Sequence, residues 1–226
     1  LKVAAHLTCV NATRAETLGI AESFANSSVT DIVALRGDPP KGDGKFTAHP
    51  EGFTSSVDLI EALKDTGRFA IRVGAYPEKH PEAANQAADI DWLKRKLDAG
   101  ADEALTQFFF EADTFFRFRD ACQRVGIDGD RLTPGILPIE NWKGVTRFAE
   151  RCGTAVPVWL IDAFEKAERD GRQDLLATAI CSELCSDLLE GGVNALHFYT
   201  LNRPELTRDV CHALGVVPRA RLQNVA

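Results

Sequence analysis

The sequence has no methionine, no long apolar run and no excess of positive charge, and each absence excludes something. Its formal net charge is −7 at pH 7, which argues against broad binding to nucleic acid or to anionic membranes. No apolar stretch approaches the roughly 18 residues of a transmembrane helix, and no signal peptide is visible. We therefore expect no nucleic-acid partner and no membrane partner.

The missing methionine bears on where the natural chain starts. Translation begins with methionine, and the initiator is normally removed only before a small residue. The sequence begins at Leu1, which is not small. We expect that Leu1 is not the native N-terminus and that further sequence precedes it.

Several catalytic and metal-binding motifs are also missing. The sequence has no Walker loop, no HExxH motif, no nucleophile elbow and no CxxC pair among its six cysteines. Cys181 and Cys185 share a helix face at a spacing that could bind a metal, but two small buried residues are the plainer interpretation. We expect no metal site, and the cysteine pattern suits a reducing cytoplasm.

Short, almost wholly apolar stretches alternate with helical patterns along the 226 residues, of which 45% are hydrophobic and 26% charged. Such stretches are typical of parallel strands that are buried on both faces. Strands are expected at residues 3–10, 31–35, 69–75, 103–109, 132–137 and 195–199. Helices are expected at residues 14–25, 56–65, 81–99, 113–125, 141–152, 158–167, 172–189 and 204–214.

Consecutive strand–helix units build either a doubly wound sheet or a barrel. No GxGxxG motif opens a helix, so the doubly wound dinucleotide-binding fold has no support. We predict an α/β fold of the (β/α)8 TIM-barrel class, with the first two βα units missing from this chain. Residues 1–226 are expected to form a single catalytic barrel domain that starts at the third strand.

Unusual polar residues follow the expected strands. They are Arg36-Gly37-Asp38, the Tyr76–His80 segment, Gln107, and the Tyr199–Arg203 segment. In β/α barrels the catalytic groups gather at the C-terminal ends of the strands. This pattern indicates an enzyme whose site can be read in order along the sequence.

Each of the first two groups has a functional and a plain interpretation. Arg36 offers a fork of donors for a phosphate or carboxylate, but it could equally form an ion pair that closes the strand end. Gly37 would let a ligand approach the backbone, and Asp38 could tune the charge of a nearby group. Tyr76 offers a ring for stacking, and His80 could either donate to an anion or be an ordinary loop histidine.

The next helix carries Asp89, Trp92, Arg95 and Lys96 at spacings that continue one face. A solvated charged face is the plain interpretation.

His6, inside the first strand, is more often a core residue than a ligand. The run Phe108–Phe110, with Phe115, Phe116 and Phe118, is interpreted as core. Gln107 needs a polar partner at its strand end, because an unpaired buried amide costs a few kcal/mol.

At these residues the sequence resembles the bacterial, single-domain form of 5,10-methylenetetrahydrofolate reductase, in matching order and spacing nearly end to end. The segments that carry the resemblance are 5–9 (AHLTC), 34–40 (ALRGDPP), 75–78 (AYPE), 80–83 (HPEA), 93–96 (LKRK), 98–101 (DAGA), 106–110 (TQFFF), 134–138 (PGILP) and 197–203 (HFYTLNR).

This resemblance implies an FAD-dependent barrel enzyme. It would take a hydride from NADH or NADPH onto the flavin and pass it to methylenetetrahydrofolate, giving 5-methyltetrahydrofolate for methionine synthesis. Because both substrates would use the same flavin face in turn, ping-pong kinetics are expected. The family also implies a cytoplasmic homo-oligomer, a dimer or a tetramer, with NADH favoured among bacterial relatives.

The site residues follow from the resemblance. Those expected to contact FAD are His6, Arg36, Gly37, Asp38, Tyr76, His80, Asp89, Arg95 and Lys96, with Ser56, Ala83 and Trp92 matching more loosely. Asp38 would lie near the flavin ring and the folate pterin, where a carboxylate disfavours an anionic reduced flavin. Gln107 would hydrogen-bond the pterin, Phe148 would stack on the aminobenzoate or the nicotinamide, and Arg203 would meet the folate end of the site.

The sequence departs from the family at its start. The family carries a catalytic glutamate on its first strand, the general acid that assists opening of the folate five-membered ring, and no such segment precedes Leu1. We expect a partial chain of a reductase. The alternatives are a non-catalytic flavin- or folate-binding remnant, and another flavin barrel of the proline dehydrogenase type. The upstream gene sequence and substrate tests would separate them.

Overall fold

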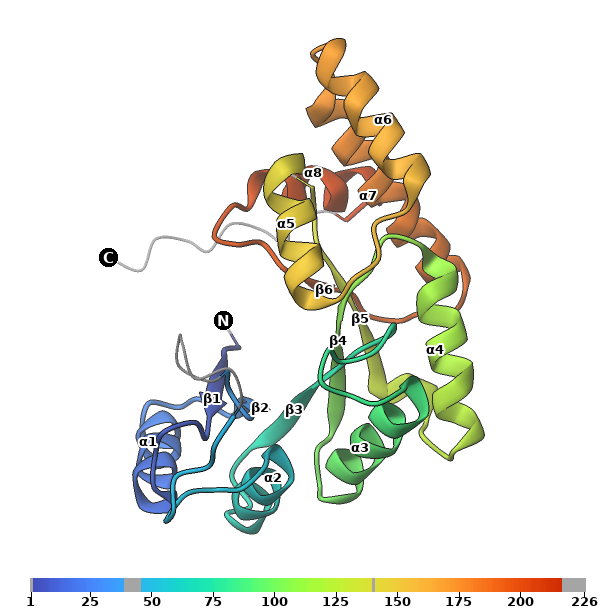
Figure 1. The fold of residues 1–226 in the computed structure, drawn as a ribbon. Coiled ribbons are helices and arrows are strands. Elements are labelled where there is room, and N and C mark those ends of the chain that lie inside the picture. Colours follow the sequence, from blue (N-terminus) through green and yellow to red (C-terminus); the bar gives the residue numbers. More distant parts are fainter. Residues whose placement is uncertain (1, 39–45, 140, 217–226) are drawn as a thin grey trace, which may run out of the picture. The chain divides into compact units, whose positions relative to one another are not determined.

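The structure, a computed structural model, describes residues 2–38, 46–139 and 141–216. It contains the strands β1 (Ala4–Thr8), β2 (Asp31–Leu35), β3 (Ala70–Ala75), β4 (Glu103–Phe108), β5 (Leu132–Ile136) and β6 (His197–Phe198) (Figure 1). These strands form one sheet in the order β1-β2-β3-β4-β5-β6, and the neighbours β1–β2, β2–β3, β3–β4 and β5–β6 pair in parallel. A doubly wound sheet reverses its strand order midway, whereas a β/α barrel keeps it sequential. The predicted barrel class is confirmed.

Helices follow the strands as expected. They are α1 (Arg14–Asn26), α2 (Ser56–Asp65), α3 (Gln86–Asp98), α4 (Ala112–Arg124), α5 (Trp142–Cys152), α6 (Val158–Arg169), α7 (Gln173–Glu190) and α8 (Glu205–Ala213), and a 3-10 turn covers Gly129–Arg131. Most bounds lie within two residues of the expected ones. Residues 39–45, which follow Asp38, lie outside the described residues.

One helix boundary was wrong. We expected the third helix to begin at residue 81, but α3 begins at Gln86. The Asn85 side chain accepts a hydrogen bond from the N–H of Ala88, at 2.8 Å, and so caps the helix there. Residues 81–85 instead belong to a loop whose backbone turns at Ala83, where the N–H donates to the His80 carbonyl.

The chain forms two compact units. The first comprises Leu1–Thr106 and Arg119–Thr133, and the second comprises Gln107–Phe118 and Pro134–Ala226. We describe each unit by itself. The predicted single domain over residues 1–226 stays a prediction.

In the first unit, α2 covers β2 and β3. Its buried side chains Leu59, Ile60 and Leu63 pack among Ile32 and Ile71 of these strands, and all five are fully buried. Burial of side chains this size stabilises the fold by about 1.5–3 kcal/mol each. The α1 helix begins with a capping box between Thr13 and Glu16.

Charged residues at the N-terminal ends of the strands form a network around Arg72 of β3. Its guanidinium donates to Asp31 of β2 and, at 2.7 Å, to Glu103 of β4. The Asp31 side chain is 2% exposed and also pairs with Lys2 at 3.1 Å. Burial alone would raise the pKa of Asp31, but hydrogen bonds from Arg72, Thr30 and Lys2 outweigh it and lower this pKa to about 2.

The second unit has an aromatic core, as the sequence indicated. Phe108, Phe109, Phe115 and Phe118 are at most 2% exposed. Trp142 of α5 stacks on Phe164 of α6, with ring centroids 4.5 Å apart and planes 6° apart. These contacts anchor the segments that follow β4 and β5 in the core of this unit.

The described residues contain no helix long and apolar enough to cross a membrane. All six cysteines are free, and Cys181 and Cys185 are buried on α7 as the plainer interpretation expected. Within the same part of the chain, no cluster of three or more His, Cys, Asp or Glu side chains is arranged to hold a metal.

The Asp31 carboxylate gives the first prediction. Its pKa in the folded protein is about 2, below the ordinary value of about 3.9, so its contribution is present above pH 4 and is lost as pH falls toward 2. Between pH 5 and pH 2.5 the wild type should lose about 1.5 kcal/mol more unfolding free energy than Asp31→Asn, which urea denaturation measures. Equal losses in both proteins would show that the network does not depress this pKa.

Candidate active site

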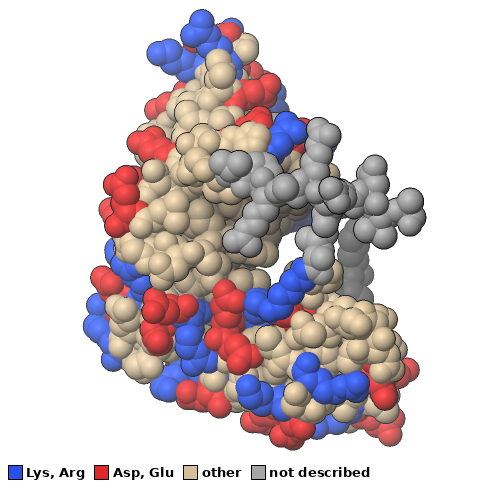
Figure 2. Space-filling view, turned by 180° about the vertical axis from the view of Figure 1, so that it is seen from behind, with Lys and Arg blue, Asp and Glu red and all other residues tan. Residues whose placement is uncertain are grey.

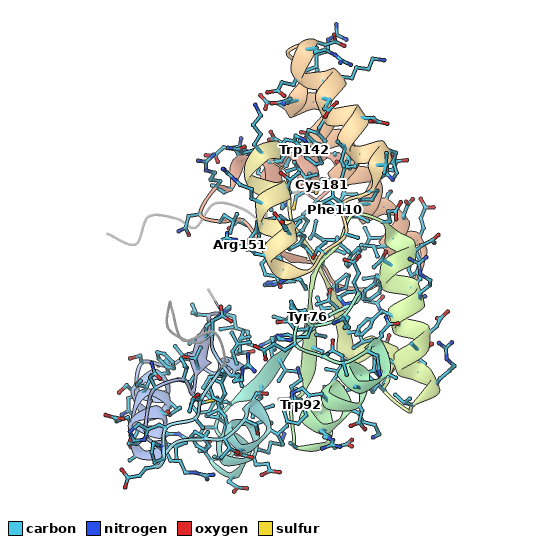
Figure 3. All side chains as sticks on the ribbon, viewed as in Figure 1. Tyr76, Trp92, Phe110, Trp142, Arg151 and Cys181 are labelled. Atoms are coloured by element: carbon cyan, nitrogen blue, oxygen red, sulfur yellow. The ribbon has the colours of Figure 1, made fainter. Side chains whose placement is uncertain are left out.

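A cavity of about 330 Å³ opens at the C-terminal ends of β2 and β3 in the first unit. We call it the strand-end pocket. It is lined by Ala34, Leu35, Arg36, Ser55, Ser56, Gly74, Tyr76, His80, Glu82, Ala83, Ala88, Asp89, Trp92 and Lys96. Most of the residues predicted to bind the cofactor are therefore brought to one cavity, and Figure 3 shows Tyr76 and Trp92 among the side chains of this unit.

Arg36 lies at the end of β2 and is held from two directions. Its Nη1 and Nη2 atoms donate to the two carboxylate oxygens of Glu82, at 2.7 and 3.2 Å. Its guanidinium also lies over the Phe46 ring, 4.9 Å from the centroid. The hydrogen bonds to Glu82 raise the pKa of Arg36 above its ordinary value. The ion pair foreseen as the plain interpretation is present, and Arg36 lines the pocket as well.

Lys96 of α3 is the buried cation of the pocket. Its residue is 8% exposed, and its ammonium donates to the carbonyl of Gly74 in β3. Burial lowers the pKa of Lys96, and the nearby Asp89 carboxylate partly opposes this effect. The net pKa is about 8. The expectation of a solvated charged face was wrong for Lys96, because helix packing turns this side chain inward across β3.

The loop that follows β3 is tied to itself by side chains. The backbone N–H of His80 donates to Asp89 Oδ2 at 2.8 Å, and the backbone N–H of Glu82 donates to the ring nitrogen Nδ1 of His80 at 3.1 Å. Because Nδ1 accepts, the neutral imidazole carries its proton on Nε2. Burial lowers the pKa of His80, which Asp89 and Glu82 oppose. The imidazole meets the Tyr76 ring edge-on, with centroids 4.6 Å apart.

Further hydrogen bonds close this loop. Lys79 Nζ donates to the Ala83 carbonyl at 2.8 Å, and Gln86 Nε2 donates to the Pro77 carbonyl at 2.8 Å. These contacts brace the pocket wall around Ala83 and His80.

Four predicted cofactor residues do not line the pocket. His6 is exposed on β1, so its interpretation as a core residue was wrong. Asp38 is exposed just past Gly37. Arg95 is exposed and pairs with Asp91 at 3.0 Å, as expected for a solvated helix face. Gly37 has φ +88°, and a Cβ there would come within 2.7 Å of Val10, so the turn requires glycine.

The second unit holds a separate cavity of about 370 Å³, which we call the α5 pocket. It is lined by Pro138, Asn141, Gly144, Val145, Phe148, Arg151, Tyr199, Thr200, Leu201 and Arg203. Two of the three predicted substrate residues, Phe148 and Arg203, lie here. The third, Gln107, lies at the end of β4, where its Oε1 accepts from the Phe108 N–H at 3.0 Å.

Phe148 is fixed by its neighbours. Its ring stacks on Phe108, with centroids 5.3 Å apart and planes 25° apart, and the Arg151 guanidinium lies 5.7 Å from its centroid. Phe148 therefore offers a half-buried ring whose orientation is set before any ligand arrives. A planar aromatic group is the ligand chemistry that this wall suits.

Two charged residues that line the pockets had no role predicted from the sequence. Glu82 stood inside a quoted segment but carried no predicted role, because nothing in its spacing pointed to Arg36. Arg151 follows Phe148 by three residues on α5, a helical spacing that could have revealed it. On the face seen in Figure 2, Lys and Arg side chains are interspersed with Asp and Glu, which suits ligand binding in pockets better than on a broad charged surface.

The family comparison and the sequence relatives agree on one family. Residues 1–215 match the family described as methylenetetrahydrofolate reductase. The chain is 45% identical over 219 residues to the 5,10-methylenetetrahydrofolate reductase of Salmonella typhimurium, covering 96% of this chain and 72% of that protein. It is 34% identical over 232 residues to methylenetetrahydrofolate reductase (NADH) 1 of Arabidopsis thaliana, covering 97% of this chain and 39% of that one.

Among solved structures, the chain is similar to an uncharacterized protein from Clostridium thermocellum that binds two copies of 5-methyl-5,6,7,8-tetrahydrofolic acid. The TM-score is 0.50 at 13% identity, covering 94% of this chain and 93% of that one. At this identity the likeness shows the fold alone.

The buried ammonium of Lys96 gives the second prediction. Its pKa of about 8 lies below the ordinary value of about 10.4, so the folded protein carries an unfavourable charge below pH 8 and gains stability as pH rises past it. Lys96→Met should therefore stabilise the ligand-free protein at pH 7 by roughly 1–3 kcal/mol in urea denaturation, and by much less near pH 10. In the control Lys94→Met, the replaced side chain is 38% exposed and pairs with Asp98 on the same helix, and stability should change by less than about 0.5 kcal/mol. A destabilised Lys96→Met would mean that the Gly74 and Asp89 contacts outweigh burial.

Proposed function

Since the chain belongs to the methylenetetrahydrofolate reductase family and carries its oxidoreductase activity, we propose that it performs this reaction with FAD held in the strand-end pocket. The family is generally FAD-dependent and acts in folate one-carbon metabolism. The same membership decides against a flavin barrel of the proline dehydrogenase type.

The observation that carries the proposal is the convergence of two cations and three aromatic rings on one cavity. Arg36 and Lys96 supply positive charge, while Tyr76, His80 and Trp92 supply flat faces. Lys96 can donate three hydrogen bonds, of which the Gly74 carbonyl takes one. A dinucleotide combines phosphate anions with planar rings, so this donor set fits FAD. The cavity, at about 330 Å³, lies at the small end for ligand pockets and suits a part of the dinucleotide.

The remaining walls have supporting roles in this proposal. Ser56 is buried at the first residue of α2, where a hydroxyl and the helix N-terminus both favour an anion. Asp89 keeps Lys96 charged and holds the His80 backbone. Trp92, 38% exposed, covers the solvent side. Gly37 and Asp38 continue the chain from Arg36, and His6 and Arg95 stay predicted contacts outside this cavity.

FAD supplies a ring that accepts a hydride and gives it up again. The residues of this chain bind, orient and shield the reacting groups. We propose NADH as the hydride donor, because the Arabidopsis relative is named for NADH. Alternate use of the flavin by donor and folate gives the ping-pong kinetics that the resemblance implied.

For the folate and the nicotinamide we propose the α5 pocket and Gln107. The Phe148 ring stacks on the aminobenzoate of folate or on the nicotinamide, and Arg203 binds the anionic glutamate end of folate. Gln107 hydrogen-bonds the pterin. Arg151, over the Phe148 ring, adds positive charge to the same wall. Assembly as a homodimer or homotetramer, and residence in the cytoplasm, stay predictions.

The third prediction concerns the cofactor itself. The purified protein, supplied with FAD during refolding or purification, should be yellow, and NADH should bleach its visible absorbance under anaerobic conditions. Addition of methylenetetrahydrofolate should then restore the colour. A colourless protein that takes up no added FAD would contradict the cofactor assignment. A protein that binds FAD but is not bleached by NADH would match the alternative of a non-catalytic flavin-binding remnant.

The fourth prediction concerns Asp38. A carboxylate beside the flavin disfavours negative charge on the reduced flavin ring. Removal of the Asp38 carboxylate should therefore act on the step that delivers the hydride to folate. In anaerobic stopped-flow experiments, Asp38→Asn should slow folate reduction about tenfold and NADH oxidation less than twofold. The control Asp65→Asn, at the exposed end of α2, should leave both steps unchanged. Equal slowing of both steps would refute a folate-specific role.

A further inference from the structure

Glu82 touches two predicted cofactor residues of the strand-end pocket from one position. Its carboxylate takes both hydrogen bonds from the end of the Arg36 guanidinium, at 2.7 and 3.2 Å. Its backbone N–H donates to Nδ1 of His80, at 3.1 Å. Glu82 also lines the pocket itself. One loop residue therefore sets the orientation of a cation and of an imidazole.

The geometry of the ion pair leaves Arg36 able to bind a second anion. A guanidinium has five N–H donors, and an end-on pair uses one from each of Nη1 and Nη2. Nε and the outer Nη hydrogens point along other edges of the group. The Phe46 ring lies against one face of the guanidinium, 4.9 Å away, so rotation about the side chain is restrained from two directions.

The backbone contact has a separate effect on His80. Because Nδ1 accepts from the Glu82 N–H, the proton of the neutral ring lies on Nε2 and faces away from that contact. The Tyr76 ring packs edge-on against this imidazole, at 4.6 Å. A side-chain substitution at position 82 keeps the backbone N–H, so it leaves the contact to His80 in place.

We propose that Glu82 is a positioning residue of the FAD pocket, holding the Arg36 guanidinium in the orientation that binds a phosphate of the cofactor; this inference rests on the proposed function. The Glu82 carboxylate could also weaken binding of the cofactor, because a carboxylate close to a phosphate repels it. Here the Arg36 and Glu82 side chains are 30% and 50% exposed, so water and salt screen that repulsion. Fixing a flexible arginine before binding lowers the entropy cost of ordering it.

The test measures the Kd of FAD for the apoprotein by quenching of flavin fluorescence, with no turnover required. Glu82→Gln keeps the shape but loses the charge and one acceptor, and it should weaken FAD binding about tenfold. Glu82→Asp keeps the charge but is one methylene shorter, and should be nearly as weak. The control Glu61→Gln, exposed on α2, makes the same charge change and should stay within twofold of the wild type.

A double substitution separates positioning from general loosening of the loop. In an Arg36→Met background, Glu82→Gln should weaken FAD binding less than twofold, because the Arg36 contact under test is already gone. Full additivity of the two effects would overturn the inference, as would tighter or unchanged FAD binding by Glu82→Gln, or wild-type affinity in Glu82→Asp. Thermal unfolding of each apoprotein checks that the variants fold.

The two proposals fail in different ways. If the wild type binds no FAD, the proposed function fails and this inference with it. If the wild type binds FAD and the Glu82 variants bind it equally well, only the role of Glu82 is overturned.

Discussion

Parallel hydrogen bonding between β2 and β3 is the constraint on which the strand-end pocket depends. Because Val33 pairs with Arg72 and Ala34 with Val73, the two strands end level, and Arg36 and Tyr76 leave the sheet at one edge. Arg72 secures the same register at the opposite ends by its contacts to Asp31 and Glu103. A slip of one residue would turn each side chain to the other face of the sheet. The charges that stabilise one end therefore preserve the geometry of the other.

The pocket is built from charges that are balanced before a ligand arrives. Arg36 faces Glu82, and Lys96 lies near Asp89, so neither cation is left alone in a poorly solvated place. Burial of Lys96 still carries a cost, which the apolar packing of α2 and α3 against the sheet offsets. Such local costs are common at binding sites, because a group held ready for a ligand is seldom in its most stable environment. Family membership and this arrangement both support the proposal that the pocket binds an anionic dinucleotide.

Much of the fold followed from patterns within short segments. Apolar runs of strand length and the helical patterns between them located most elements to within two residues. The start of α3 was missed because loop hydrogen bonds of Lys79, His80 and Gln86, which join residues up to nine positions apart, compete with helix formation there. The helix pattern alone favoured a solvated charged face for Lys96, since a charged side chain on a polar helix usually faces water, whereas the family resemblance assigned it to FAD. Its burial depends on where α3 meets β3, and no local pattern encodes that meeting.

By itself the sequence determined the strand–helix alternation, the polar groups at strand ends and, through its motifs, the family. It did so because backbone propensity, capping and side-chain periodicity act over a few residues. Only the tertiary structure decided that Arg36 pairs with Glu82, that Lys96 points inward to the Gly74 carbonyl, and that His6 and Arg95 lie outside the cavity. Those outcomes depend on contacts across 22 and 46 positions of sequence, where the packing of whole elements decides which side chains meet.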